Sequence, residues 1–126
     1  MYSTDASVYQ IEPLGVVVPR TRQDVVRAVE IAARHGVSIT ARGGGTSQAG
    51  QAIGAGIQPD TSKYPNRIVE VNVAERWAWI APGVVLDEPN AHLQPHGLRF
   101  APDISTPIRA TVGGLIPNNA SGARPG

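Results

Sequence analysis

The sequence has no cysteine, no long apolar run and almost no net charge, and each absence excludes a class of protein or site. Without cysteine among the 126 residues, disulfides, thiolate metal ligands and a cysteine nucleophile are impossible. No apolar run approaches the roughly 20 residues that cross a bilayer, so we expect no membrane span. Residues 1–7 contain neither a basic nor an apolar stretch, which argues against a secretory signal and predicts a cytoplasmic protein.

The charges nearly cancel, because eleven Lys and Arg residues face ten Asp and Glu residues. A net charge of +1 gives no basic surface of the kind that binds nucleic acid or an anionic membrane, so we expect neither partner. What the sequence contains in excess is glycine and proline, with 14 and 11 residues. They predict many turns and short elements, in one domain that spans residues 1–126.

A run of three glycines dominates the first half of the chain. Consecutive glycines are poor in helices and strands, but they expose a row of N–H groups and adopt positive φ, so the backbone can curl around an anion. The neighbouring residues add two hydroxyl groups and a positive charge at the entrance. The stretch predicts a cradle for phosphate or pyrophosphate, formed by Arg42, Gly43, Gly44, Gly45, Thr46, Ser47, Gly50 and Gln51. A flexible glycine loop without a ligand is the alternative.

This loop matches neither of two common nucleotide-binding motifs. Gly45 and Gly50 have the separation of a Walker A loop, but Gln51 and Ala52 follow where that motif needs Lys and Ser or Thr. Three successive glycines also differ from the G-x-G-x-x-G fingerprint of Rossmann domains. The loop therefore predicts an anion site of another type.

The first half of the chain predicts a compact βαβ unit. Residues 15–18 form a short apolar run typical of a buried strand. Thr21 and Asp24 stand at the N-cap and N3 positions of an amphipathic helix, which His35 and Gly36 end. Residues 37–40 predict the next strand, which leads into the glycine loop. Residues 58–62 have the composition of a turn.

The second half predicts a hairpin and a short helix. Residues 67–73 and 76–81 read as two antiparallel strands, and Trp77 and Trp79 on one face are expected to pack in the core or on the sheet. A helix is expected to begin near Asp87 or Glu88, because Pro89 is tolerated in a first turn, and to end at residues 95–97. The fold class is thus α+β: a small βαβ subdomain with short parallel strands and flanking helices, then a β-hairpin that starts a second mixed or antiparallel sheet.

Polar residues and glycines gather again after residue 100. They offer a carboxylate, hydroxyls, amides and sites of close backbone approach, at Pro102, Asp103, Ser105, Thr106, Gly113, Gly114, Asn118, Asn119 and Gly122, with Arg124 beyond them. Ordinary turns would account for such loops by themselves. Two loops of this composition in one small chain favour a shared ligand.

These motifs, in this order, resemble the N-terminal part of the FAD-linked oxidase domain of the vanillyl-alcohol oxidase or PCMH type. The likeness is strongest to FAD-dependent D-2-hydroxyacid dehydrogenases that act on D-lactate, glycolate or D-2-hydroxyglutarate. It covers nearly the whole chain, from residues 2–7 and 13–19 through the glycine loop and residues 82–84 to residues 102–106, 113–114, 118–119 and 122–124.

The resemblance implies a division of work between the two loops. In the family, the segment that matches residues 42–47 holds the FAD pyrophosphate through backbone N–H groups, and the later loop lies along the phosphates and the flavin. Some relatives attach FAD covalently through a histidine of the glycine loop, where this chain has Gly45 and Thr46, so we expect non-covalent FAD. The reaction implied is hydride transfer from a 2-hydroxy acid to FAD.

The family's catalytic base and carboxylate-binding cations belong to a separate substrate domain beyond residue 126. We therefore expect no catalytic residue and no metal ligand in this chain; His35, His92 and His96 match no catalytic position of the family. By itself the fragment is expected to be inactive, and a 2-hydroxy acid would bind only with the C-terminal domain. A truncated, non-catalytic remnant and a generic phosphate- or nucleotide-binding module are the alternatives.

Overall fold

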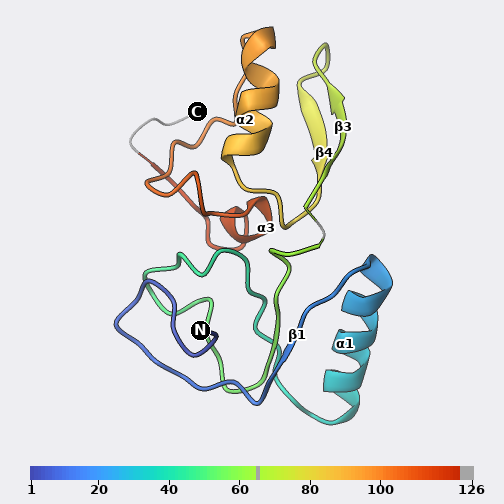
Figure 1. The fold of residues 1–126 in the computed structure, drawn as a ribbon, viewed down its shortest axis with the longest axis vertical. Coiled ribbons are helices and arrows are strands. Elements are labelled where there is room, and N and C mark those ends of the chain that lie inside the picture. Colours follow the sequence, from blue (N-terminus) through green and yellow to red (C-terminus); the bar gives the residue numbers. More distant parts are fainter. Residues whose placement is uncertain (65, 123–126) are drawn as a thin grey trace.

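A computed structural model describes residues 1–64 and 66–122 of the chain, and it has the predicted α+β class. In chain order the elements are β1 (Gly15–Val17), α1 (Arg22–Arg34), β2 (Ile57–Pro59), β3 (Ile68–Asn72), β4 (Trp77–Ile80), α2 (Asp87–Leu93), the 3₁₀ turn η1 (Gln94–His96) and α3 (Val112–Leu115). β1 and α1 lie at one end of the molecule, and the β3–β4 hairpin and α2 lie at the other (Figure 1).

Local sequence signals fix both ends of α1, as predicted. The Thr21 hydroxyl accepts a hydrogen bond from the Asp24 N–H, and the Asp24 carboxylate accepts the Thr21 N–H in return at 3.0 Å. Backbone N–H groups of Arg20 and Thr21 lower the pKa of Asp24, because they stabilise its charged form. At the other end, Gly36 adopts φ +63°. The helix buries two alanines, Ala28 and Ala32.

The parallel sheet differs from the predicted strand pairing. β1 pairs with β2, with Gly15 opposite Ile57 and Val17 opposite Pro59. The predicted strand at residues 37–40 contributes only one isolated bridge, from Ile39 to Ile57, and a second isolated bridge follows it, from Arg42 to Asp60. The turn predicted at residues 58–62 is wrong at its start, because residues 58 and 59 belong to β2. Pro59 fits there because its carbonyl accepts from the Arg42 N–H at 2.9 Å and no donor is required of it.

The predicted hairpin forms, but its tryptophans do not pack as expected. β3 and β4 pair antiparallel, with Asn72 opposite Trp77, and the turn includes Arg76 at φ 59°. Trp77 and Trp79 share a face, since alternate residues of a strand do, yet their side chains are 37% and 67% exposed. Packing in the core is therefore wrong for Trp79, which is mostly exposed, whereas Trp77 is partly covered.

A small apolar core joins α2 to α3. α2 begins at Asp87 with Pro89 in its first turn and is followed by η1, which Gly97 ends at φ +69°; this agrees with the prediction. The cluster contains Leu86, Ala110 and Leu115, with Phe100, Ile104 and Ala120 packed against it. α3 is a single helical turn, although the sequence predicted a glycine loop at these residues. Two backbone hydrogen bonds hold it in place: the Val112 N–H donates to the Val84 carbonyl at 2.8 Å, and the Gly113 N–H donates to the Pro82 carbonyl at 2.9 Å.

Candidate functional site

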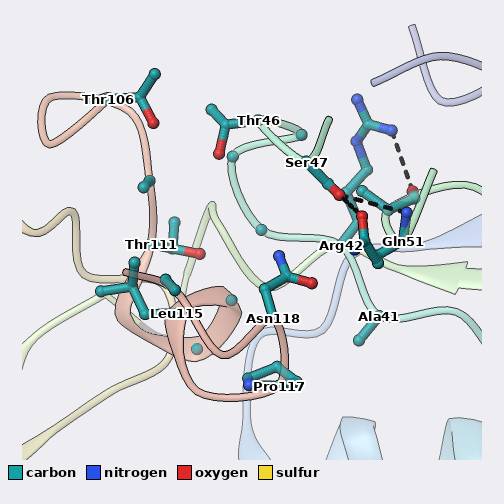
Figure 2. Close-up of a pocket in the computed structure, with 18 of the residues that line it drawn as sticks. Ala41, Arg42, Thr46, Ser47, Gln51, Thr106, Thr111, Leu115, Pro117 and Asn118 are labelled. Carbon is teal, nitrogen blue, oxygen red and sulfur yellow. Dashed lines mark hydrogen bonds between the residues drawn. The ribbon is translucent and has the colours of Figure 1, made fainter. Parts of the chain in front are cut away.

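A cleft of about 690 Å³ opens between two segments that lie far apart in the sequence (Figure 2). One wall, the glycine-loop wall, consists of residues 39–52, and the other, the α3 wall, consists of residues 104–121; Thr61 also contributes. A volume of this size falls in the range of roughly 300–1,000 Å³ that small-molecule and cofactor pockets occupy. The arrangement can therefore enclose a large part of a nucleotide-sized ligand.

Most of the residues proposed from the sequence meet at this cleft. Those that line it are Arg42, Gly43, Gly44, Gly45, Thr46, Ser47, Gln51, Ser105, Thr106, Gly113, Gly114 and Asn118. Five others do not line it: Gly50, Pro102, Asp103, Asn119 and Gly122. Arg124 lies outside the described residues. What each of these residues contributes to binding remains a prediction.

The glycines of the loop allow the two walls to approach each other closely. A Cβ atom at Gly43 would collide with the Thr111 side chain, and a Cβ atom at Gly44 would collide with the Arg109 carbonyl. Gly45 takes φ +67°, a conformation that favours glycine. Each of the three positions thus needs glycine for a structural reason, and the same lack of side chains leaves the backbone open toward the cleft.

Hydroxyl groups face the cleft from both walls. Figure 2 shows Thr46 and Thr106 on segments from the two walls, with both hydroxyls directed toward the side of the cleft where Thr111 and Asn118 lie. Ser47 instead closes the loop on itself: its hydroxyl contacts the Gln51 side-chain oxygen and accepts the Gln51 N–H at 3.3 Å. The Gln51 oxygen also accepts the Ala49 N–H at 3.2 Å. Ser47 and Gln51 therefore shape the loop more directly than they present donors to a ligand.

The guanidinium of Arg42 is turned away from the cleft entrance where its charge was expected. The side chain is only 8% exposed. It donates to the carbonyls of Ala52 at 3.4 Å and Met1 at 3.3 Å, and it lies 5.4 Å from the centre of the Tyr2 ring. Figure 2 shows the bond to the Ala52 carbonyl as a dashed line. The cation is thus used mainly between the glycine loop and the N-terminal residues.

Two carboxylates flank this arginine and are ionised at neutral pH. Burial raises the pKa of Asp60, but hydrogen bonds from Ser62 and Tyr2 and the nearby Arg42 charge lower it more, so the net shift is downward. Asp5 behaves alike: burial raises its pKa, and bonds from Ser7 and from the Ala52 N–H outweigh that effect. The Tyr2 hydroxyl donates to Asp60 at 2.8 Å, which raises the pKa of Tyr2.

Sequence reasoning missed Thr111, which precedes α3 and lines the cleft. Thr111 is 3% exposed, and its hydroxyl oxygen is buried without a hydrogen-bond partner. It lies against Gly43 and lines the cleft. A buried hydroxyl without a partner costs stability, so this group fits a site that receives a polar ligand. The only sequence signal was a hydroxyl residue two positions before the glycine pair.

The described cleft contains no histidine and no tyrosine. His35 caps α1, His92 lies in α2 and His96 in η1. Among residues 1–64 and 66–122, no cluster of His, Asp and Glu is placed to hold a metal ion. Within that same part of the chain, no helix is both long and apolar enough to cross a membrane.

The fold and the cleft define a cofactor-binding domain with a glycine loop opposite a short helix. The family model for the FAD binding domain matches residues 13–125, and the chain belongs to this family. It is 46% identical over 123 residues to a D-2-hydroxyglutarate dehydrogenase of Escherichia coli K12, which covers 95% of this chain and 12% of that protein. It is 32% identical over 131 residues to the glycolate oxidase subunit GlcD of Bacillus subtilis, covering 98% of this chain and 27% of that protein.

Solved structures show the same fold. A cholesterol oxidase from B. sterolicum superposes with a TM-score of 0.73 at 29% identity, covering 86% of this chain and 21% of that chain. An alkyldihydroxyacetonephosphate synthase gives a TM-score of 0.73 at 24% identity, covering 85% and 22%. The chain therefore corresponds to a small part of each of these proteins.

Proposed function

We propose that this chain holds FAD non-covalently in the cleft, as the N-terminal portion of the FAD-binding domain of a dehydrogenase or oxidase that converts a 2-hydroxy acid. Residues 1–126 would form one part of that domain. The substrate class follows from the D-2-hydroxyglutarate dehydrogenase and GlcD relatives. A cytoplasmic location remains a prediction from the sequence.

The observation that carries this proposal is the convergence of two polar, glycine-containing segments on one cleft. Gly43–Gly45, Thr46, Thr106, Thr111 and Gly114 all line the same cleft. Backbone N–H groups that glycine leaves uncovered suit the diphosphate of a dinucleotide. The buried hydroxyl of Thr111 is a further polar atom that a bound cofactor could satisfy. The residues present therefore fit FAD.

Non-covalent attachment is supported by the chemistry of the side chains. The sequence contains no cysteine, and none of the described cleft residues is a histidine or a tyrosine. A covalent bond to the flavin needs a nucleophilic side chain of this kind beside it. When bound, FAD supplies the hydride acceptor, and the protein supplies position and electrostatics. The chain's own part is to hold the cofactor and to exclude water from its phosphates.

Gly114 in α3 provides a sharp test. Gly114 lines the cleft, and a Cβ there would touch only the Thr111 hydroxyl, at an ordinary 3.7 Å. Gly114→Ala is therefore expected to leave the fold intact, to favour the helix slightly, and to lower FAD affinity by about tenfold, since a methyl group would occupy the cleft. Gly15→Ala is the matched control, because its Cβ meets nothing within 4 Å and it lies in β1, away from the cleft.

The measurement is a flavin-fluorescence titration of the wild-type chain and both variants, with thermal unfolding as a check of folding. FMN and ADP are titrated in parallel. Tight FAD binding that Gly114→Ala weakens and Gly15→Ala does not would support the proposal. Absence of FAD binding by the wild-type chain would contradict it, and equal affinity for ADP and FAD would favour a generic nucleotide-binding module.

A further inference from the structure

The first fourteen residues form an arm that contacts the glycine loop from the side opposite the cleft. Residues 1–14 supply no cleft-lining residue. Figure 1 shows this arm, in dark blue, beside the segment that carries the glycine loop. The FAD-binding family model begins only at residue 13, although the alignment with GlcD covers 98% of this chain.

The arm holds its own shape before it reaches the loop. Thr4 and Gln10 form an antiparallel bridge, and the Ile11 N–H donates to the Ser3 carbonyl at 2.9 Å. Asp5 accepts the Ser7 N–H at 2.8 Å, which turns the chain between the two bridged residues. These local bonds place residues 1–5 on one side and residue 9 on the other side of a short hairpin-like loop.

Three contacts then connect this arm to both ends of the glycine loop. At the start of the loop, the Arg42 guanidinium lies over the Tyr2 ring and donates to the Met1 carbonyl. At the end of the loop, the Ala52 N–H donates to the Asp5 carboxylate at 3.4 Å. The Tyr9 ring lies beside Gly50, which has φ +79°, so that a Cβ atom at this glycine would be 3.2 Å from the ring.

Arg42 joins these contacts into one unit. Its guanidinium also donates to the Ala52 carbonyl, so a single side chain links the first and last residues of the loop to the arm. Its backbone is fixed as well, because Arg42 N–H donates to the Pro59 carbonyl and Thr61 N–H donates to the Arg42 carbonyl, both at 2.9 Å. Tyr2, which the guanidinium covers, is anchored to Asp60 just after β2 at 2.8 Å.

We propose that the arm is a latch that positions the glycine loop for the cofactor, with Arg42 and Tyr2 as its positioning residues rather than as ligands of the phosphates. The effect of the arm on FAD binding rests on the proposed function, whereas the contacts between the arm and the glycine loop do not. Because coupling between two sites is reciprocal, an arm that improves FAD binding must itself become more ordered when FAD binds.

The test removes the hydroxyl group from each of two tyrosines of the arm in turn. Tyr2→Phe keeps the ring under Arg42 but removes the bond to Asp60. Tyr9→Phe removes a hydroxyl from a largely exposed side chain and keeps the ring against Gly50, so it is the matched control. In the absence of FAD, hydrogen exchange at residues 42–52 is expected to rise several-fold in Tyr2→Phe and to stay at the wild-type level in Tyr9→Phe, while exchange in α2 stays constant as an internal reference.

With FAD present, three further results are expected. Affinity falls about five- to tenfold in Tyr2→Phe and not in Tyr9→Phe. Exchange in residues 1–14 of the wild-type chain slows on FAD binding, although these residues do not touch the cleft. Arg42→Lys lowers the FAD affinity, because a compact ammonium group lacks the planar fork with which the guanidinium reaches two carbonyls and covers the Tyr2 ring.

Unchanged exchange of residues 42–52 in Tyr2→Phe would overturn the latch, as would full FAD affinity in Arg42→Lys. If the wild-type chain binds no FAD, the proposed function fails, and the exchange experiment without FAD still decides whether the arm positions the loop.

Discussion

The two walls of the cleft are held in place by different kinds of interaction. The glycine-loop wall is tied to the arm and to β2 by charged and polar side chains, above all Arg42, Asp5 and Asp60. The α3 wall is held by backbone hydrogen bonds and by apolar packing of Leu86, Ala110 and Leu115. One wall should therefore respond to pH and to charge, and the other to changes of side-chain volume.

This difference matches what each wall has to do. A loop of consecutive glycines has few side chains to bury, so it needs long polar side chains from neighbouring segments to fix its path. A helical turn of four residues is too short to be stable alone, and α3 is stabilised because its Leu115 packs against Leu86 and Ala110. One wall of the cleft is therefore held in position by polar tertiary contacts, and the other is held in position by apolar packing against the core.

The largest expected effect is on the α3 wall. Leu86→Ala removes a fully buried side chain from the cluster beneath α3 and should lower the free energy of unfolding by about 3 kcal/mol. Leu14→Ala, at an exposed position, is the control and should change it by less than about 0.5 kcal/mol. Urea denaturation followed by circular dichroism measures both. Equal losses in the two variants would show that this cluster does not support the wall.

The glycine-loop wall is tested by Asp60→Asn. The carboxylate accepts hydrogen bonds from Tyr2 and from Ser62, and charge-assisted bonds of this kind predict a loss of about 2 kcal/mol at pH 7. Because the pKa of Asp60 is lowered in the folded state, its stabilisation is complete above the unfolded pKa of about 3.9 and is lost as the pH falls through the folded pKa.

The difference between wild type and Asp60→Asn should therefore shrink below about pH 4. Leu86→Ala should show the same loss across that range, because no charge is involved. Glu70→Gln on β3 is the matched carboxylate control, and its effect should stay within about 0.5 kcal/mol. A loss in Asp60→Asn that persists unchanged into acid would mean that the side chain acts through packing and not through its charge.

A substitution at Gln58, in β2, is expected to stabilise the protein, and by less than the two preceding substitutions destabilise it. Its side chain is fully buried, and both amide atoms are without a partner, which is costly. Gln58→Met keeps the length and approximate shape of the side chain and should raise the free energy of unfolding by about 1 kcal/mol. Gln23→Met, on the exposed side of α1, should be close to neutral. A destabilised Gln58→Met would mean that the amide is satisfied, for example by buried water.

Elements specified by neighbouring residues were predictable from the sequence, and those specified by distant contacts were not. Thr21 and Asp24 form their capping box within four residues of chain, so the start of α1 was correct. β2 was missed because Gln58 and Pro59 have turn composition, and only their pairing with β1 and Arg42 makes them a strand. α3 was missed because Gly113 and Gly114 favour loops when Leu115 packing is unknown.

The same limit applies to the site. Glycine and hydroxyl content indicated both walls of the cleft, and the family resemblance indicated that they belong together. The direction of the Arg42 side chain depends on its contacts with Tyr2 and with Met1, which lies 41 positions away in the sequence. No local sequence pattern contains that information. Thr111 was missed because a buried hydroxyl without a partner is visible only in three dimensions.

The β3–β4 hairpin belongs to neither wall, and it should give the smallest effect. The alternation of side chains along a strand places Trp77 and Trp79 on one face of the hairpin. It does not indicate whether other residues cover that face. Because Trp79 is mostly exposed and Thr suits a strand, Trp79→Thr should change the free energy of unfolding by less than about 0.5 kcal/mol. Trp77→Thr should cost more, about 1 kcal/mol, since it loses the bond from its indole N–H to Glu75 at 2.8 Å. Denaturation curves that give Trp79→Thr the larger loss would place its ring against other residues and would restore the packing role that the sequence had suggested.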